Sequence, residues 1–266
     1  MRFSKIEKPK VYKFLIAGSE GKGKTTLGSR FPNPVFMPFE DGLASIAETG
    51  AEAFPLIKNS DEIRQSFREL IGQDHDRKTL VVDSITALMR MVEKEIVDKD
   101  GSKSINQALG GYGAGRSAVY MKAISFIESC RIVMEKCGMH IVWIGHEQIE
   151  TVNPPDSPSY DRRTIYGTTH SVSPFIQTAD VVAFIKQVTY TASESSDSNR
   201  EINIGLGERE IVCQPDPGSV AKNRIGVSKS LPFRLDEGNP FTPYIAEKNN
   251  SLTSVDTVQK GDAEST

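Results

Sequence analysis

Short apolar segments alternate with amphipathic ones along most of the chain. Continuous runs rich in β-branched and aromatic residues predict five buried strands, at residues 11–17, 35–39, 80–83, 140–145 and 180–187. Helical periodicity between these runs predicts helices at residues 25–30, 61–71, 85–97 and 117–137. Strands that alternate with helices are typical of an α/β fold with a mostly parallel central sheet flanked by helices.

The pattern changes beyond residue 187. Residues 201–204 and 209–214 flank Gly205-Leu206-Gly207-Glu208 and predict an antiparallel hairpin at the edge of the same sheet. From residue 247 onward polar residues dominate, which predicts a disordered C-terminal tail over residues 247–266. We therefore expect one core domain over residues 1–246.

The composition is that of a soluble globular protein. The 266 residues are 38% hydrophobic and 25% charged. No apolar run approaches the roughly 18 residues that a membrane-spanning helix needs, and no secretory signal begins the chain. Cys130, Cys137 and Cys213 show no metal-ligand spacing and are expected to be reduced thiols. We expect a cytosolic protein without membrane contact, disulfides or a metal cluster.

Charge is unevenly distributed. The net charge is only −3, so the whole molecule does not resemble a nucleic-acid-binding protein. Residues 101–122, 162–179 and 217–235 nevertheless contain nine Lys or Arg and no Asp or Glu. These stretches allow a positive local potential within an acidic protein. Ordinary charge scatter over solvated loops is the alternative.

One motif decides the class of protein. The segment Gly18-Ser19-Glu20-Gly21-Lys22-Gly23-Lys24-Thr25 fits the pattern G-x-x-x-x-G-K-S/T, with a predicted strand before it and a helix after it. The backbone N–H groups of such a loop converge on phosphates, Lys24 neutralises the β- and γ-oxygens, and the Thr25 hydroxyl ligates Mg²⁺. We expect residues 18–26, including Thr26, to bind a nucleoside triphosphate.

Two carboxylates complete this predicted site. Asp83 ends the third predicted strand and is expected to hold the metal together with Thr25. Glu40 ends the second predicted strand and is our candidate for acting on the attacking water, in preference to Asp41. A solvated acidic turn is the alternative interpretation of Glu40.

Together these residues resemble the RecA-like recombinases, and most closely the minimal RecA-core single-strand annealing ATPases of bacteriophages. The resemblance covers residues 11–235 in order. Family features are matched by Phe39-Glu40-Asp41-Gly42-Leu43, by Asp83-Ser84, by Ile144-Gly145-His146, where His replaces the usual Gln, and by Ala221-Lys222-Asn223-Arg224-Ile225-Gly226. Compared with full-length RecA, we expect this protein to lack the N-terminal oligomerisation helix and strand and the separate C-terminal domain.

The resemblance implies a RecA-like P-loop NTPase core that uses ATP and Mg²⁺. It implies that Glu40 is catalytic and that His146 senses the γ-phosphate, although a plain core histidine remains the alternative for His146. It also implies that Lys222 and Arg224 reach the ATP of a neighbouring subunit in a homo-oligomer, either a filament or a ring.

The family's two DNA-binding loops correspond to residues 98–116 and 147–178, which overlap two of the acid-free stretches. We expect them to bind single-stranded DNA without membrane involvement, with a single-strand-binding protein as a further partner. Phosphate contacts and base stacking are expected from cationic and aromatic side chains respectively. These side chains are Lys103, Arg116, Arg162 and Arg163, and Tyr112 and Tyr166.

The leading functional hypothesis is a DNA-dependent ATPase that promotes strand annealing or pairing in recombination. A DnaB-like helicase or translocase is the nearest enzymatic alternative. A nucleotide-gated annealing protein with little turnover belongs to a different class, and the His146 substitution keeps it open. A small-molecule kinase fits least, because it needs an arginine-rich lid and has no use for Lys222 and Arg224.

Overall fold

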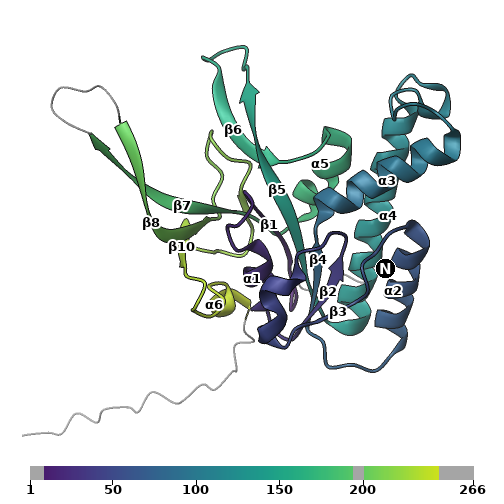
Figure 1. Cartoon of the computed structure of the whole chain (residues 1–266), viewed down its shortest axis with the longest axis horizontal. Coiled ribbons are helices and arrows are strands. Elements are labelled where there is room, and N and C mark those ends of the chain that lie inside the picture. Colours follow the sequence, from purple (N-terminus) through teal and green to yellow (C-terminus); the bar gives the residue numbers. More distant parts are fainter. Residues whose placement is uncertain (1–8, 194–200, 246–266) are drawn as a thin grey trace, which may run out of the picture.

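A computed structural model describes residues 9–193 and 201–245 of the chain, which form a single large sheet with helices on both faces (Figure 1). The strands are β1 (Lys13–Gly18), β2 (Pro34–Pro38), β3 (Glu52–Ala53), β4 (Thr79–Asp83), β5 (His140–Val152), β6 (Tyr160–Ile165), β7 (Val181–Ser193), β8 (Glu201–Val212), β9 (Lys222–Asn223) and β10 (Ser230–Phe233). The helices are α1 (Lys24–Ser29), α2 (Ser60–Gly72), α3 (Ile85–Asp100), α4 (Ala114–Cys137), α5 (Thr169–Thr178) and α6 (Thr242–Ile245), with short 3₁₀ turns η1 (Leu43–Thr49) and η2 (Ala108–Gly110).

The strand order is β10-β8-β7-β1-β5-β4-β2-β3. All pairings from β7 to β3 along this path are parallel, whereas β8, β10, β9 and β6 pair antiparallel with their neighbours. This arrangement confirms the α/β fold with a mostly parallel sheet and an antiparallel edge. In the described part of the chain no helix is long and apolar enough to cross a bilayer.

The central strands are apolar on both faces because both faces are covered. In β1, Leu15 and Ala17 pack into a core with α2, α3, α4 and α5, whereas Phe14 and Ile16 pack on the opposite face with α1 and the C-terminal segment. Gly28 lets α1 approach the sheet closely, since a Cβ there would lie 3.0 Å from Cγ1 of Val81. Two cores therefore fix the strand ends that carry the candidate site residues.

The predicted hairpin at residues 201–214 is wrong in detail. Residues 201–212 form the single strand β8, which pairs with β7, and the connection between the two strands lies outside the described residues. The register is irregular here, because β7 advances from Gln187 to Thr189 while β8 moves from Arg209 to Gly205. The glycines that suggested a turn therefore mark a bulge.

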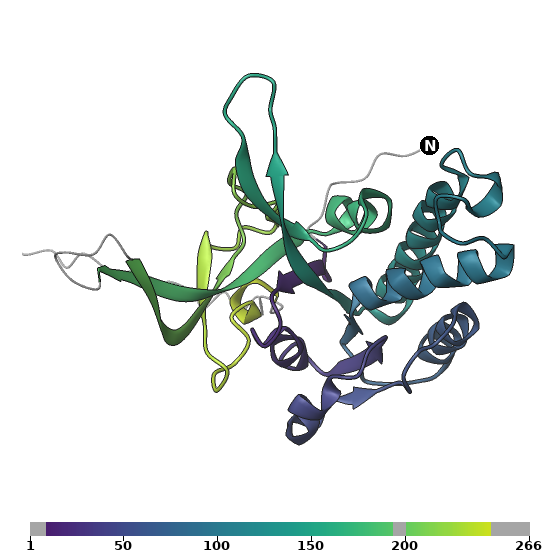
Figure 2. The same ribbon diagram turned by 45° about the horizontal axis from the view of Figure 1, so that its top comes forward.

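The two segments expected to be DNA-binding loops contain regular structure. Strand β5 continues past the predicted end at residue 145, returns as β6 and leads into α5. This β5–β6 hairpin extends away from the body of the sheet in both views (Figures 1 and 2). Helix α3 runs to Asp100 and α4 begins at Ala114, so the first segment is a short connection that contains η2. The predicted tail, residues 247–266, lies outside the described residues.

Candidate functional site

The glycine-rich loop joins β1 to α1 as predicted. Gly21 and Gly23 have φ angles of 69° and 91°, in the left-handed region that glycine adopts without a steric cost. A Cβ on Gly23 would also lie 2.6 Å from Cδ2 of Leu235. The loop therefore needs glycine at this position for both its backbone conformation and its packing.

Lys24 is buried at the start of α1, with 8% of its surface exposed. Its Nζ donates hydrogen bonds of 2.9 Å to the carbonyl oxygens of Gly18 and Ser19. Burial lowers the pKa of Lys24, and the nearby carboxylates of Asp83 and Glu40 oppose that shift. A polyanion bound in the loop would stabilise the charged ammonium and give it a partner other than the loop's own carbonyls.

Thr25 and Asp83 meet beside the loop. The Thr25 hydroxyl donates a 2.8 Å hydrogen bond to Oδ2 of Asp83, and burial raises the pKa of Asp83. Hard oxygen donors of this kind suit Mg²⁺, which commonly uses one or two protein ligands and takes the rest from phosphate and water. The hydroxyl of Thr25 and the carboxylate of Asp83 therefore form a donor set that fits Mg²⁺. Within the described ranges, no group of three or more His, Cys, Asp or Glu side chains could hold a metal ion.

Glu40 lies at the mouth of the same site, two residues beyond the end of β2. Its Oε1 is 3.2 Å from Nε2 of His146, and the hydrogen bond with His146, with a second from Ser84, lowers the pKa of Glu40 despite partial burial. The backbone N–H of His146 donates to Oγ1 of Thr86 at 3.1 Å, which ties the middle of β5 to the first turn of α3. A carboxylate held in its charged form can orient an attacking water or accept its proton.

The remaining loop residues occupy the rim of the site. Ser19 and Glu20 line a cavity of about 580 Å³, which Glu40, Arg90, His146, Glu147 and Tyr166 also line. Lys22 donates a 2.7 Å hydrogen bond to Oε1 of Gln187 on β7. The carbonyl of Thr26 accepts a 2.9 Å hydrogen bond from Ser29 within α1.

Glu147 is a residue of the nucleotide site that the sequence interpretation missed. Its carboxylate accepts hydrogen bonds from the Ser19 hydroxyl and, at 3.3 and 3.4 Å, from Nη1 of Arg163 on β6. The phosphate-binding loop is thus linked directly to the β5–β6 hairpin. The only available signal was that Glu147 directly follows His146 at a strand end.

The proposed DNA-contacting side chains of the α3–α4 connection are exposed. Tyr112 is fully exposed and has a φ of 50°, whereas Lys103 lies exposed before η2. Arg116, in the first turn of α4, donates from Nε to Oδ1 of Asn106 at 2.9 Å. These three side chains share one surface segment of 14 residues, 103–116.

In the second expected DNA-binding segment, residues 147–178, the two arginines of β6 form ion pairs with carboxylates of β5. Arg162 forms an ion pair of 2.6 Å with Glu150, and Arg163 pairs with Glu147, both from the facing strand β5. The guanidinium of Arg90 lies over the ring of Tyr166, 5.0 Å from the ring centre, in a cation–π contact. The acid-free stretch at residues 162–179 is therefore partly neutralised by carboxylates that the fold brings next to it.

Lys222 and Arg224 lie near the C-terminal end of α5. Nζ of Lys222 donates to the carbonyl oxygens of Gln177 and Ile176 at 2.6 and 3.2 Å, where cations counter the partial negative charge of a helix C-terminus. Burial lowers the pKa of Lys222, and the charge of Arg224 adds to this shift. Arg224 is exposed, with its backbone N–H bonded to Asp180 O at 2.9 Å.

Comparison with known proteins identifies a family for the chain. No curated protein resembles the chain significantly. A protein-family model described as an AAA domain matches residues 10–225, which include the glycine-rich loop, Glu40, Asp83, His146 and Arg224. Because this match spans most of the chain and the loop has the geometry described above, the chain belongs to the AAA domain family and is a nucleotide-binding ATPase of the P-loop type.

Proposed function

We propose that this ATPase acts on single-stranded DNA in recombination, as an oligomer that promotes strand annealing or pairing, like the phage ATPases that its sequence resembles. One observation carries the proposal: strand β5 belongs both to the nucleotide site and to the surface proposed to bind DNA. His146 on β5 contacts Glu40 in the nucleotide site, and the next residues of β5 form the projecting β5–β6 hairpin. A change at the triphosphate therefore has a short route to the strand-binding surface.

Within the nucleotide site each residue has a separate role. Lys24 binds the β- and γ-phosphate oxygens, and Thr25 with Asp83 would hold Mg²⁺. When bound, the ion neutralises charge on the transferring phosphoryl group. Glu40 orients the attacking water and accepts its proton, while His146 reports the state of Glu40 and the γ-phosphate to β5.

The strand-binding surface combines the α3–α4 connection with the β5–β6 hairpin. Lys103 and Arg116 neutralise phosphates, and the exposed ring of Tyr112 stacks on a base. Arg162 and Arg163 contribute after exchanging their carboxylate partners for phosphate. Because these two cations are partly neutralised, we expect them to add less to DNA affinity than Lys103, which forms no ion pair within the described residues.

The exposed side chain of Arg224 supports a contact between subunits. A cation supplied across an interface stabilises charge on a neighbour's triphosphate only when the subunits are assembled. Lys24→Ala subunits keep Arg224 but cannot bind ATP, whereas Arg224→Ala subunits bind ATP but offer no Arg. Hydrolysis that reappears when the two are mixed would support the contact, and its absence in cross-linked mixed oligomers would refute it.

The proposed DNA binding is tested by titrating single-stranded oligonucleotides with a non-hydrolysable ATP analogue present. Affinity should fall steeply with salt, by a slope of roughly 0.7 per phosphate contact on a log–log plot. The Lys103→Ala and Arg116→Ala variants should each weaken binding and reduce that slope. Lys136→Ala, an exposed cation at the opposite end of α4, should bind like wild type. Wild-type protein that does not bind would refute the proposal.

A further inference from the structure

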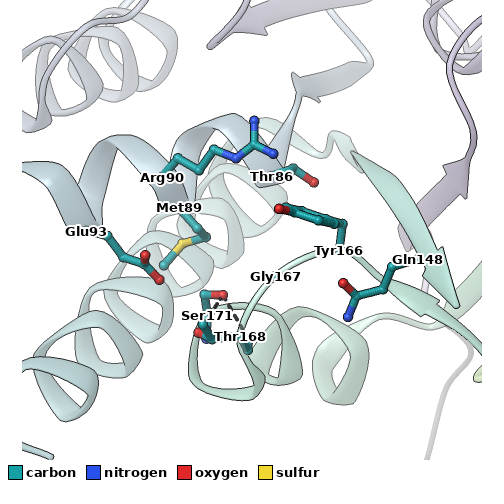
Figure 3. A pocket seen from close by; sticks show the side chains of 9 residues that line it. All are labelled: Thr86, Met89, Arg90, Glu93, Gln148, Tyr166, Gly167, Thr168 and Ser171. Carbon is teal, nitrogen blue, oxygen red and sulfur yellow. Dashed lines mark hydrogen bonds between the residues drawn. The ribbon is translucent and has the colours of Figure 1, made fainter. Parts of the chain in front are cut away.

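A second cavity lies directly beside the nucleotide site, and none of the roles proposed above for ATP hydrolysis uses it. It measures about 290 Å³, at the lower end of the range for ligand pockets, and suits a single small group. Figure 3 shows the residues that surround it, from α3, β5, the turn before α5 and the first turn of α5. They are Thr86, Met89, Arg90, Glu93, Gln148, Tyr166, Gly167, Thr168 and Ser171.

Two of these side chains enter from opposite sides without a partner. Glu93 comes from α3 and Gln148 from β5, and neither forms a hydrogen bond or ion pair within the described part of the chain (Figure 3). Burial raises the pKa of Glu93. By contrast, the hydroxyls of Thr168 and Ser171 are hydrogen-bonded to each other at 3.1 Å. Glu93 and Gln148 therefore offer a ligand a carboxyl group and an amide, alongside the polar groups of Arg90 and Tyr166.

The other walls include an apolar, an aromatic and a cationic side chain. Met89 supplies a flexible thioether, and Tyr166 supplies a ring that is 45% exposed, with Arg90 stacked on it. Planar groups bind well between such side chains, while a carboxyl group and an amide pair with donors and acceptors at the edge of the ring. This combination fits a nucleobase better than a phosphate, because the aromatic ring and the thioether suit a planar group and the Arg90 cation is balanced by the Glu93 carboxyl group.

We propose that this pocket receives one nucleobase of a bound single strand, which makes it a base-reading subsite of the proposed strand-binding surface. The inference rests on the DNA-binding function proposed above. Arg90 and Tyr166 line both this pocket and the nucleotide cavity, so base insertion and nucleotide binding share two side chains. The exposed guanidinium of Arg90 also stands at the entrance, where the phosphate that carries the base would pass.

The test compares an ordinary oligonucleotide with one of equal length whose sugars all lack bases. Both strands carry the same phosphates, so electrostatic binding is matched. Wild-type protein with a non-hydrolysable ATP analogue should bind the ordinary strand about tenfold tighter or more, because base stacking contributes to affinity. A Glu93→Leu/Gln148→Leu variant should lose most of that preference while keeping its DNA-independent ATPase rate. A Glu48→Leu/Gln214→Leu control, altered at exposed positions elsewhere, should keep it.

The outcomes separate the two proposals. Equal affinity for both strands in wild type would overturn the base pocket but leave DNA binding intact. An undiminished base preference in the Glu93→Leu/Gln148→Leu variant would show that other contacts, such as stacking on Tyr112, carry it, and would overturn the base pocket too. Thermal stabilisation by free deoxynucleosides, without a base preference in strands, would assign the pocket to a free nucleoside instead. If wild type binds neither strand, the proposed function fails and the subsite fails with it.

Discussion

Nε2 of His146 lies 3.2 Å from Oε1 of Glu40, and this contact joins β5 to the segment after β2, although these two strands are not neighbours in the sheet. Strand β4, which ends in Asp83, runs between them. A candidate base, a candidate metal ligand and a histidine are thus close enough for their charges to interact. Because β5 continues into the β5–β6 hairpin, it connects His146 directly to that hairpin.

Lys24 and Glu40 should fail in different ways when substituted. Lys24→Ala should abolish ATP binding, because the buried ammonium is the main counter-charge to the phosphates. Glu40→Gln should bind ATP normally yet lose hydrolysis by about 10²- to 10⁴-fold, since an amide cannot accept the proton of water. Nucleotide binding by fluorescence and steady-state phosphate release measure the two effects.

Asp41→Asn is the matched control, because Asp41 is the exposed neighbour of Glu40. It should hydrolyse ATP at close to the wild-type rate. Normal turnover by Glu40→Gln together with loss in Asp41→Asn would assign the catalytic carboxylate to Asp41 instead.

Asp83→Asn should maintain or raise the stability of the nucleotide-free protein but weaken its binding of Mg²⁺. Burial raises the pKa of Asp83, so its ionised form costs stability in the folded protein. The nucleotide-free variant should therefore melt at or above the wild-type temperature at neutral pH, and this advantage should shrink as pH falls through the raised pKa. The stabilisation that Mg²⁺ with nucleotide gives to wild type should be lost. A variant that melts well below wild type without nucleotide would contradict this assignment.

Glu147→Gln should tighten nucleotide binding. The carboxylate contacts Ser19 in the phosphate-binding loop, so it repels an incoming triphosphate, whereas glutamine keeps the size and the acceptor oxygen. We expect an affinity several-fold higher for a non-hydrolysable ATP analogue, measured by calorimetry at low salt. Glu20→Gln, at an exposed position of the same loop, should have a smaller effect. Weaker binding by Glu147→Gln would show that the Ser19 and Arg163 contacts require the charge.

His140 should make the protein sensitive to mild acid. Burial lowers the pKa of His140 to about 4, against about 6.5 in an unfolded chain. Between these values only the unfolded state binds the proton, so folding stability should fall by up to about 3 kcal/mol as pH drops from about 6.5 to about 4.

Comparison with His140→Asn isolates this effect in denaturant titrations at several pH values. Asparagine can replace Nδ1 as the acceptor for the Tyr12 N–H, which His140 binds at 3.1 Å. The variant should show a shallower loss of stability with acid, and His170→Asn, at an exposed site, should follow wild type. Equal slopes for wild type and His140→Asn would refute the buried neutral histidine.

Local patterns were enough to predict the parallel core and the phosphate-binding loop. The apolar runs that contain Phe14 and Val81 are buried on both faces, and such runs are distinctive in sequence. The Lys24 motif is recognised by residues that are adjacent in the chain. Both features depend on short-range information, which one sequence contains.

The remaining features depend on which distant segments meet. The partners of Arg162 and Arg163 are Glu150 and Glu147 on the facing strand, so a stretch without acids is not a surface without acids. Gly205 looked like part of a turn because the pairing of β8 with β7 is not visible in the sequence. Glu147 was overlooked for the same reason, since its contact with Ser19 spans 128 residues.

We propose that ATP hydrolysis by this protein depends on single-stranded DNA, and the decisive experiment is the steady-state ATPase rate with and without a long single strand. The basal rate should be slow and should rise by about tenfold or more when single-stranded DNA is added at low salt. Lys103→Ala/Arg116→Ala protein should lose that rise, whereas Lys136→Ala protein should keep it. A rate that is the same with and without the strand, in protein shown to bind ATP, would refute DNA-dependent hydrolysis.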